Sequence, residues 1–414
     1  MRDRAQRAIT ECQLIAGFTE EPGRTTRRFL TPPVHLVHAH LRKRMEAMGM
    51  AVHVDAAGNL RGLWQPRGAH ANPAATGKRL LLGSHIDTVP NAGAYDGVLG
   101  VVLALEWTQL AQELAYPLPI EVIAFSEEEG VRYGVPFLGS RAVAGSFDAA
   151  LLTLKDADGI AMEEAIRAFG LDPVSVPAAA ADAENVLGFV EIHIEQGPAL
   201  EAENAALAVV EGIAGQSRME FEFAGQANHA GTTPMHLRRD ALAAAVEWMT
   251  EVEIMARSVD GLVATVGKMR VEPNAANVIP GSVTVSLDAR HKSDDTRAQA
   301  VRDLTAKAAE IAARRGIGLD YMERMNQPGV RMDDELTDRL LRAIEAAGFV
   351  KKTMHSGAGH DAMVMAACVP ATMLFLRSPG GISHHPDESV REEDVEAALL
   401  VGRKFLEQLA ADVR

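Results

Sequence analysis

The sequence is poor in the features that mark disulfide-stabilised and membrane-spanning proteins. Only two of its 414 residues are cysteine, Cys12 and Cys368, and neither belongs to a CxxC pair. Such a low cysteine content is typical of a reducing compartment and argues against a zinc site built from thiolates. No apolar run approaches the roughly 20 residues that a bilayer-spanning helix needs. We therefore expect a cytoplasmic protein that does not cross a membrane.

Positively charged residues are outnumbered by negatively charged ones. The chain has 41 lysine and arginine residues against 56 aspartate and glutamate residues, which gives a formal net charge of −15 at pH 7. This balance disfavours nucleic acid and anionic membranes as partners, because both repel an acidic protein. A small anionic substrate stays possible, since a few local arginines can hold one. Residues 1–18 mix acids with bases and contain no long apolar core, so no secretion signal is predicted.

The composition is otherwise that of a globular protein, with 47% hydrophobic and 23% charged residues. Buried strands are expected at Leu80–Leu82, Ile120–Phe125 and Phe189–Ile194, and Gly83 is expected to end the first of them. A helix of small and aliphatic residues, Gly97–Leu114, lies between the first two strands. Alternating buried strands and helices predict an α/β domain with a mixed, largely parallel sheet.

A different pattern occupies the middle of the chain. Longer alternating strands are expected at 209–225 and 262–271, with a further strand at 283–288 and helices at 237–257 and 296–315. This order is close to the β-α-β-β-α-β arrangement of a split βαβ domain.

The chain is too long for one ordinary core, so two domains are expected. The simplest account of the change in pattern is an insertion. Residues 1–212 and 326–414 would form one domain, and residues 213–325 would form a smaller α+β domain inserted in it. A polar loop is expected at 65–76.

Polar clusters follow the expected strands at their carboxyl ends, where α/β folds build their sites. In the first cluster, His85 and Asp87 are two residues apart, so in extended backbone they share a face and the carboxylate can hold one ring nitrogen. Asp96 follows after a turn. The remaining clusters lie at residues 126–130, 193–197, 360–361 and 384–385.

Three consecutive glutamates, Glu127 to Glu129, stand beside a buried strand in the second cluster. Such a run is unfavourable there unless something neutralises it, and the histidines expected nearby make a bound cation the better explanation. Imidazole and carboxylate ligands without cysteine suit zinc, manganese, cobalt or iron. The sequence therefore predicts a metal site.

Eight motifs in series resemble one enzyme family. In chain order they are GSHIDTV, AYDG, SEEEGVRYG, HIEQGP, NHAGTTPM, PNAANVIPG, SGAGHDA and GISHHPDE. Together they resemble the M20 metallopeptidase-like amidohydrolases, in the branch of allantoate amidohydrolase, N-carbamoyl-L-amino acid hydrolase and β-ureidopropionase. The resemblance implies a catalytic domain that binds two divalent ions (Zn²⁺, or Mn²⁺ or Co²⁺). It also implies that the inserted domain is a lid and dimerisation domain, so that a homodimer is expected.

The resemblance implies roles for residues of the first domain. Asp96 would bridge two metal ions, Asp87 would orient His85, and Glu128 would be the general base that takes a proton from a shared water. The implied metal ligands are His85, Asp96 and His193 for one ion, and Asp96, Glu129 and His384 for the other.

The resemblance also implies how the substrate is held. His229 resembles the histidine that polarises the scissile carbonyl across a dimer. Asn277 and Arg290 resemble the pair that clamps the substrate carboxylate, a task that suits a planar guanidinium because it binds a carboxylate through two hydrogen bonds. Gln196 and Gln216 are further candidates for substrate binding.

Three residues stay unassigned. Glu127 is open because the run of glutamates permits a register slip of one residue. His360 has a partner in Asp361, and the motif that it matches lines the site in the family without supplying a ligand. His385 is the alternative to His384 and is expected at the surface or behind the ligands.

These observations predict a metal-dependent amidohydrolase that cleaves the C–N bond of a ureido group next to a carboxylate. Allantoate is the preferred substrate, because AYDG and the segment RRFLTPP around Arg28 resemble allantoate or ureidoglycolate enzymes. N-carbamoyl-L-amino acids, β-ureidopropionate and ureidoglycolate are the alternatives, and HIEQGP argues against an aminoacylase or dipeptidase. A non-catalytic binding protein of this fold would be expected to have lost a ligand or Glu128, and all are present.

Overall fold

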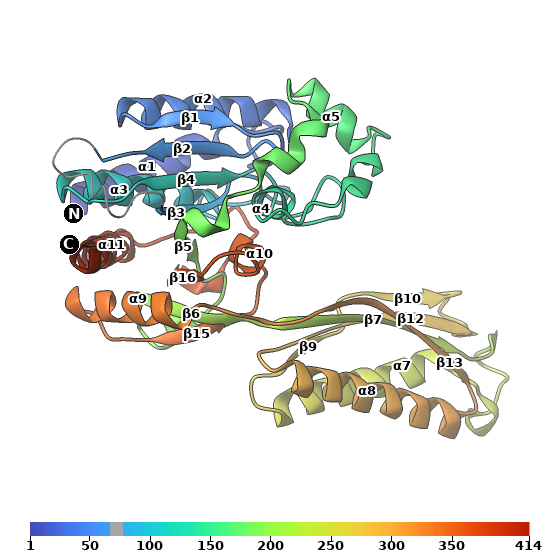
Figure 1. The fold of residues 1–414 in the computed structure, drawn as a ribbon. Helices are drawn as coiled ribbons and strands as arrows, with labels where there is room; N and C mark the ends of the chain where they lie inside the picture. The colour runs from blue at the N-terminus through green and yellow to red at the C-terminus, as the bar shows by residue number, and fades with distance from the viewer. Residues whose placement is uncertain (67–77, 414) are drawn as a thin grey trace. The chain divides into compact units, whose positions relative to one another are not determined.

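The computed structural model describes residues 1–66 and 78–413, so most of the polar loop expected at 65–76 lies outside the described residues. The chain divides into two compact units (Figure 1). One comprises Met1–Glu211 and Arg331–Arg414, and the other comprises Gly212–Val330. None of the helices in the described ranges combines the length and apolarity that a bilayer crossing requires.

The first unit contains a nine-stranded mixed sheet. Its strands are β1 (Ala51–Val54), β2 (Leu60–Trp64), β3 (Arg79–His85), β4 (Ile120–Phe125), β5 (Val186–Ile194), β6 (Leu207–Ile213), β14 (Val330–Arg331), β15 (Thr353–Ser356) and β16 (Ala371–Leu376). Their order is β1-β2-β4-β3-β5-β16-β6-β14, and β15 pairs with β6. Parallel ladders join β4, β3, β5 and β16, whereas β2 and β6 are antiparallel to their inner neighbours.

Buried apolar segments form the centre of this sheet, as expected of parallel strands covered on both faces. Every residue of β4 and of β16 is buried. The helix α3 packs against β3, β4 and β5, and α1 and α11 pack against α3 (Figure 1). The helices of this unit are α1 (Arg2–Ala16), α2 (Pro32–Ala47), α3 (Val98–Glu113), α4 (Leu138–Val143), α5 (Met162–Ala168), α6 (Ala199–Ala202), α9 (Asp334–Ala346), α10 (Asp361–Met365) and α11 (Glu392–Val413).

The strand β3 does not end at Gly83, so that prediction is wrong. Gly83 pairs with Ile123 of β4 and with Glu191 of β5. A Cβ atom on Gly83 would lie 2.2 Å from the carbonyl oxygen of Ile123. This glycine therefore permits close packing inside the sheet, and the strand continues until it brings His85 to the carboxyl edge.

The second unit has a five-stranded antiparallel sheet in the order β10-β12-β7-β13, with β9 beside β12, and a two-stranded sheet of β8 and β11. Its strands are β7 (Gly215–Ala224), β8 (Asn228–His229), β9 (Val263–Thr265), β10 (Met269–Glu272), β11 (Val278–Ile279), β12 (Ser282–His291) and β13 (Gly318–Gln327). Two helices, α7 (Ala241–Ser258) and α8 (Asp294–Arg315), pack on the sheet around a core that includes Phe221, Phe223 and Trp248.

Two expected strands of this region are each divided in the structure. Residues 209–225 contribute to β6 and β7, which pair in different sheets, because the chain passes from the first unit to the second at Glu211–Gly212, near the end of β6. Residues 262–271 form β9 and β10. Between them, the three residues 266–268 lie opposite only the two residues 286–287 of β12, and this extra residue interrupts the ladder with β12.

Candidate metal centre

Side chains that can bind a metal gather at the carboxyl edge of the parallel strands in the first unit. His85 ends β3, and His193 is the penultimate residue of β5. Asp96 lies in the loop between β3 and α3, Glu129 follows β4, and His384 lies in the loop between β16 and α11. Because parallel strands end at one edge of the sheet, residues far apart in the sequence become neighbours there.

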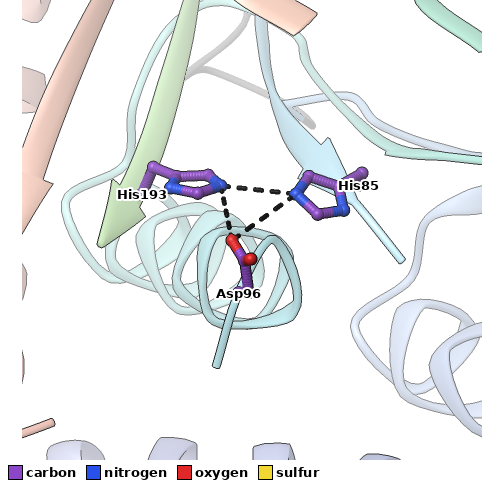
Figure 2. Close-up of side chains that lie close together, drawn as sticks. All are labelled: His85, Asp96 and His193. Carbon is purple, nitrogen blue, oxygen red and sulfur yellow. Dashed lines mark hydrogen bonds and ion pairs between the residues drawn. The ribbon is translucent and has the colours of Figure 1, made fainter. Parts of the chain in front are cut away.

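The tightest group is a triangle of His85, Asp96 and His193 (Figure 2). The two Nε2 atoms are 3.3 Å apart, and Oδ1 of Asp96 lies 3.3 Å from Nε2 of His193 and 3.8 Å from Nε2 of His85. All three residues are buried. One atom of each is thus directed at a common centre, as the metal-site prediction requires.

Backbone carbonyls determine the tautomer of both rings. Nδ1 of His85 lies 3.1 Å from the carbonyl oxygen of Asp87, and Nδ1 of His193 lies 2.8 Å from that of Ile194. A carbonyl can only accept, so each Nδ1 carries a hydrogen, and in a neutral ring Nε2 then presents a lone pair. Burial lowers the pKa of His193 to about 4, so this ring is neutral at pH 7.

One positive charge at the centre of the triangle would therefore be stabilised by the Nε2 lone pairs of the two histidines and by the carboxylate of Asp96. In the protein alone, a proton on His85 can supply it. Burial opposes that proton, but the hydrogen bond to Asp87 and the carboxylate charge raise the pKa of His85 well above its usual value. A divalent cation can replace the proton, because neutral imidazoles and a carboxylate are ordinary ligands of zinc, manganese and cobalt. The donor set thus fits a metal ion.

A second group shares Asp96 with the first. Nε2 of His384 lies 3.2 Å from Oδ2 of Asp96 and 3.5 Å from Oε1 of Glu129. That Glu129 oxygen is buried and has no hydrogen-bond partner among the described residues. Burial, and next the charge of Asp96, raise the pKa of Glu129 to about 7, while the hydrogen bond to Asp96 raises the pKa of His384 to about 9. Asp96 therefore turns one oxygen toward each group.

Asp87 connects the ends of β3 and β4. Its carboxylate accepts the backbone N–H groups of Glu128 and Glu129 at 2.9 and 3.0 Å, and Oδ1 lies 3.4 Å from Nδ1 of His85. The side chain of Glu128 is buried, and this burial raises its pKa well above the usual value. A buried carboxylate with a raised pKa is suited to accept a proton near neutral pH.

The structure also shows what surrounds Glu127, His360 and His385, which the sequence left unassigned. Glu127 is fully buried, and within the described part of the chain neither of its carboxylate oxygens has a hydrogen-bond partner. The ring of His360 packs edge-on against His193 with centroids 4.5 Å apart, and its Nε2 lies 2.8 Å from the hydroxyl of Ser356. His385 is exposed, with Nδ1 3.6 Å from the carboxylate of Asp387.

Gln196, expected to bind substrate, directs its side chain at the metal ligands. Its Nε2 donates to both carboxylate oxygens of Asp96, at 3.0 and 3.1 Å, and lies 3.4 Å from Nε2 of His384. The amide nitrogen thus lies beside Asp96 and His384, within 3.4 Å of a donor atom of each.

The remaining predicted residues belong to the second unit and form two pairs. In the first pair, His229 of β8 lies opposite Val278 of β11, and the N–H of Ala230 donates to the carbonyl of Asn277 at 2.9 Å. The N–H of Gly231 donates to Nδ1 of His229 at 3.1 Å. Because Nδ1 accepts, the hydrogen of the neutral imidazole lies on Nε2, which can then act as a donor.

The second pair is Arg290 of β12 and Gln216 of β7, which are opposite each other in the ladder. Asp288 holds both of them. It accepts from Nε of Arg290 at 2.9 Å, from Nη2 at 3.2 Å and from Nε2 of Gln216 at 2.5 Å, while Arg218 also donates to it at 3.0 Å. The two bonds from one guanidinium fix its plane, as a bidentate pair does.

Three further residues of these clusters, Asp288, Glu191 and Glu388, were not predicted from the sequence. Asp288 could have been found from its position two residues before Arg290 on a strand, because this spacing places the two side chains on one face. Glu191 has the same spacing from His193, and it accepts from the hydroxyl of Ser84 at 3.0 Å. Glu388 belongs to a motif that was recognised for its histidine alone.

Comparison with known proteins gives the family. Residues 81–410 match the family model described as Peptidase family M20/M25/M40. The chain is 37% identical to a probable allantoate deiminase of Oryza sativa subsp. japonica, over 96% of this chain and 87% of that protein. It is 40% identical to an N-carbamoyl-L-amino acid amidohydrolase of Geobacillus stearothermophilus, over 84% of this chain and 85% of that protein. A solved amidase of the hydantoinase/carbamoylase family from Burkholderia multivorans superposes with a TM-score of 0.89 at 31% identity, covering 98% and 97% of the two chains.

Proposed function

The chain belongs to peptidase family M20/M25/M40, and we propose that it is a binuclear metal-dependent amidohydrolase whose substrate is allantoate. The resemblance inferred from the eight motifs is confirmed, as is the α/β fold with a mixed, largely parallel sheet. Its relatives are named as amidohydrolases and deiminases, so it is a hydrolase that acts on C–N bonds. We further propose the cytoplasm as its compartment, on the two free cysteines.

The observation that carries this proposal is the buried triangle of His85, Asp96 and His193 with both Nδ1 atoms bonded to carbonyls. These three residues would hold one ion, and Asp96, Glu129 and His384 would hold a second. Zinc, manganese and cobalt all match the donor set. When bound, such ions supply Lewis acidity and lower the pKa of a water between them.

Glu128 is proposed as the general base. Its buried carboxylate would take a proton from the attacking water as the water oxygen bonds to the ureido carbonyl carbon, and the proton would pass to the departing nitrogen as the C–N bond breaks. The role of Asp87 is to hold the end of the β4 strand against His85, because its carboxylate contacts both.

The second unit is proposed to recognise the substrate. His229 would donate from Nε2 to the scissile carbonyl, since the N–H of Gly231 occupies Nδ1. Arg290 and Asn277 would bind the substrate carboxylate, with Gln216 beside them. We propose that this unit, Gly212–Val330, also forms a homodimer in which His229 serves the neighbouring subunit.

The test is ammonia release by the purified protein supplied with Zn²⁺, Mn²⁺ or Co²⁺ in turn. We expect kcat/KM for allantoate to exceed that for N-carbamoyl-L-amino acids, and we expect His85→Ala to lose nearly all activity together with bound metal. A higher kcat/KM for an N-carbamoyl-L-amino acid would transfer the assignment to the alternative substrate. Full metal loading without hydrolysis of any ureido carboxylate would overturn the proposed reaction.

A further inference from the structure

Glu388 reaches from the loop before α11 to the loop before α3. Its side chain is buried, and Oε1 accepts the backbone N–H groups of Tyr95 and Asp96 at 2.9 and 3.0 Å. Oε2 accepts from the hydroxyl of Ser383 at 3.3 Å. One carboxylate therefore joins two loops that are nearly 300 residues apart in the sequence.

The fit around this carboxylate is tight. A Cβ atom on Gly93 would lie 2.4 Å from Cβ of Glu388, so only glycine leaves room for the side chain at this point. The hydroxyl of Ser383 also lies 3.5 Å from Oδ2 of Asp96, which adds a second link between the same two loops.

The loop that carries Glu388 also carries His384. The backbone of His384 has a φ of +56°, a left-handed conformation that is unfavourable for a non-glycine residue. Such conformations persist when surrounding contacts fix them. Glu388 supplies contacts of this kind, because its own N–H closes a turn onto the carbonyl of His385 at 3.0 Å while its carboxylate is bonded to the opposite loop.

We propose that Glu388 is a positioning residue that holds Asp96 and His384 at the separation required to share a cation. The proposal rests on the proposed function, in which both are metal ligands. Oε1 of Glu388 already accepts two amides and Oε2 faces a hydroxyl, so the carboxylate serves as an acceptor for the loop backbone and not as a ligand.

Three substitutions separate geometry from charge. Glu388→Ala removes the acceptor. Glu388→Gln keeps an oxygen at full reach but removes the charge, whereas Glu388→Asp keeps the charge and withdraws the oxygen by one methylene. If the position of the acceptor oxygen is what matters, Glu388→Gln retains the zinc affinity of wild type. Glu388→Ala and Glu388→Asp then lose it.

Glu201→Ala is the matched control. The carboxylate of Glu201 also anchors this C-terminal loop, since it accepts from the N–H of Gly380 and from Nη2 of Arg391, but it touches neither Tyr95 nor Asp96. A general loosening of the loop would therefore affect this variant as much as it affects Glu388→Ala.

The readout is the binding of Zn²⁺ alone to the metal-free proteins, measured by calorimetry and by competition with a chelator. We expect wild type to bind two ions and Glu388→Ala to bind one of them about 10- to 100-fold more weakly, as is typical when the residue that orients a ligand is removed. Glu388→Asp should resemble Glu388→Ala, while Glu388→Gln and Glu201→Ala should resemble wild type. Circular dichroism of the metal-free proteins verifies folding, and if Glu388→Ala does not fold, the Gln and Asp variants decide.

Several outcomes would overturn the proposal. Equal zinc affinity in wild type and Glu388→Ala would overturn it alone and leave the metal site intact. Weak binding by Glu388→Gln with normal binding by Glu388→Asp would show that charge matters instead of position. An equal loss of zinc affinity in Glu201→Ala would show that the effect comes from general anchoring of the loop and not from the position of Asp96 and His384. If wild type binds no zinc, both this inference and the proposed metal site fail.

Discussion

At the scale of single residues, neighbouring glutamates have different surroundings. Glu129 lies beside His384 and has a carboxylate oxygen directed at the second group of donors. Glu128 is one residue earlier, and burial, together with the charges of nearby carboxylates such as Glu129, raises the pKa of its carboxyl well above the usual value. The two side chains are therefore expected to do different work, one as a ligand and the other as a base.

Glu128→Gln is expected to retain bound metal and to lower kcat by about 10²- to 10⁴-fold, which is the usual contribution of a general base. Glu129→Gln, its matched neighbour, is expected to lower metal content instead. Metal analysis and ammonia release measured on the same samples distinguish the two variants. Loss of metal with turnover intact in Glu128→Gln would identify Glu128 as a ligand.

At the scale of elements, the helix α2 contains a buried histidine. The ring of His38 packs edge-on against Phe169 with centroids 5.7 Å apart, and its Nε2 has no hydrogen-bond partner within residues 1–66 and 78–413. Burial lowers the pKa of His38 to about 3, against a usual value of 6.5. The folded protein therefore leaves this ring neutral at pH values at which the unfolded chain protonates it.

This difference predicts a loss of stability in acid. Below pH 6.5 the unfolded chain binds a proton that the folded protein excludes until about pH 3, so the free energy of unfolding falls as pH falls through that window. At pH 5, protonation of His38 in the unfolded chain lowers the free energy of unfolding by about 2 kcal/mol. His38→Leu should lose less stability than wild type between pH 7 and pH 5 in urea unfolding. His35→Leu is the control, because the ring of His35 stacks on the same Phe169 but is exposed. An equal pH dependence of the free energy of unfolding in wild type and in His38→Leu would contradict the prediction.

The elements also show what could be read from the sequence. Buried strands were predictable, because a run such as Ile120–Phe125 is apolar throughout and both faces are covered. Local turn chemistry predicts a strand end at Gly83, whereas the actual role of this glycine depends on the carbonyl of Ile123 on another strand. The bond between Glu388 and the Asp96 backbone was equally out of reach, since no periodicity connects loops so far apart.

In the first unit, the sequence predicted that His85, Asp96 and His193 lie together, but not how their side chains are oriented. The position of His85 and His193 at strand ends indicated that they would be neighbours. The carbonyls that determine their tautomers, and the carboxylate of Asp288 that holds Arg290, depend on backbone positions that only the folded sheets define.

At the scale of the whole molecule, the proposed chemistry divides between the two units. The candidate metal ligands and Glu128 belong to the first unit, whereas His229, Asn277 and Arg290 belong to Gly212–Val330. An enzyme with its base on one unit and its recognition residues on another needs a conformational step that completes the site and excludes water. A homodimer in which each second unit serves the other subunit is the arrangement that we propose.

Mixing two inactive variants tests this arrangement. His229→Ala retains Glu128, and Glu128→Gln retains His229, so a heterodimer contains one complete site if His229 acts on the other subunit and none if it acts within its own chain. Random exchange of equal amounts makes half of the dimers heterodimers, so about one quarter of wild-type activity should return. Light scattering would verify the dimer, and exchange of differently tagged subunits would verify mixing. Complete exchange without any recovery of activity would show that His229 works within its own chain or has no part in the reaction.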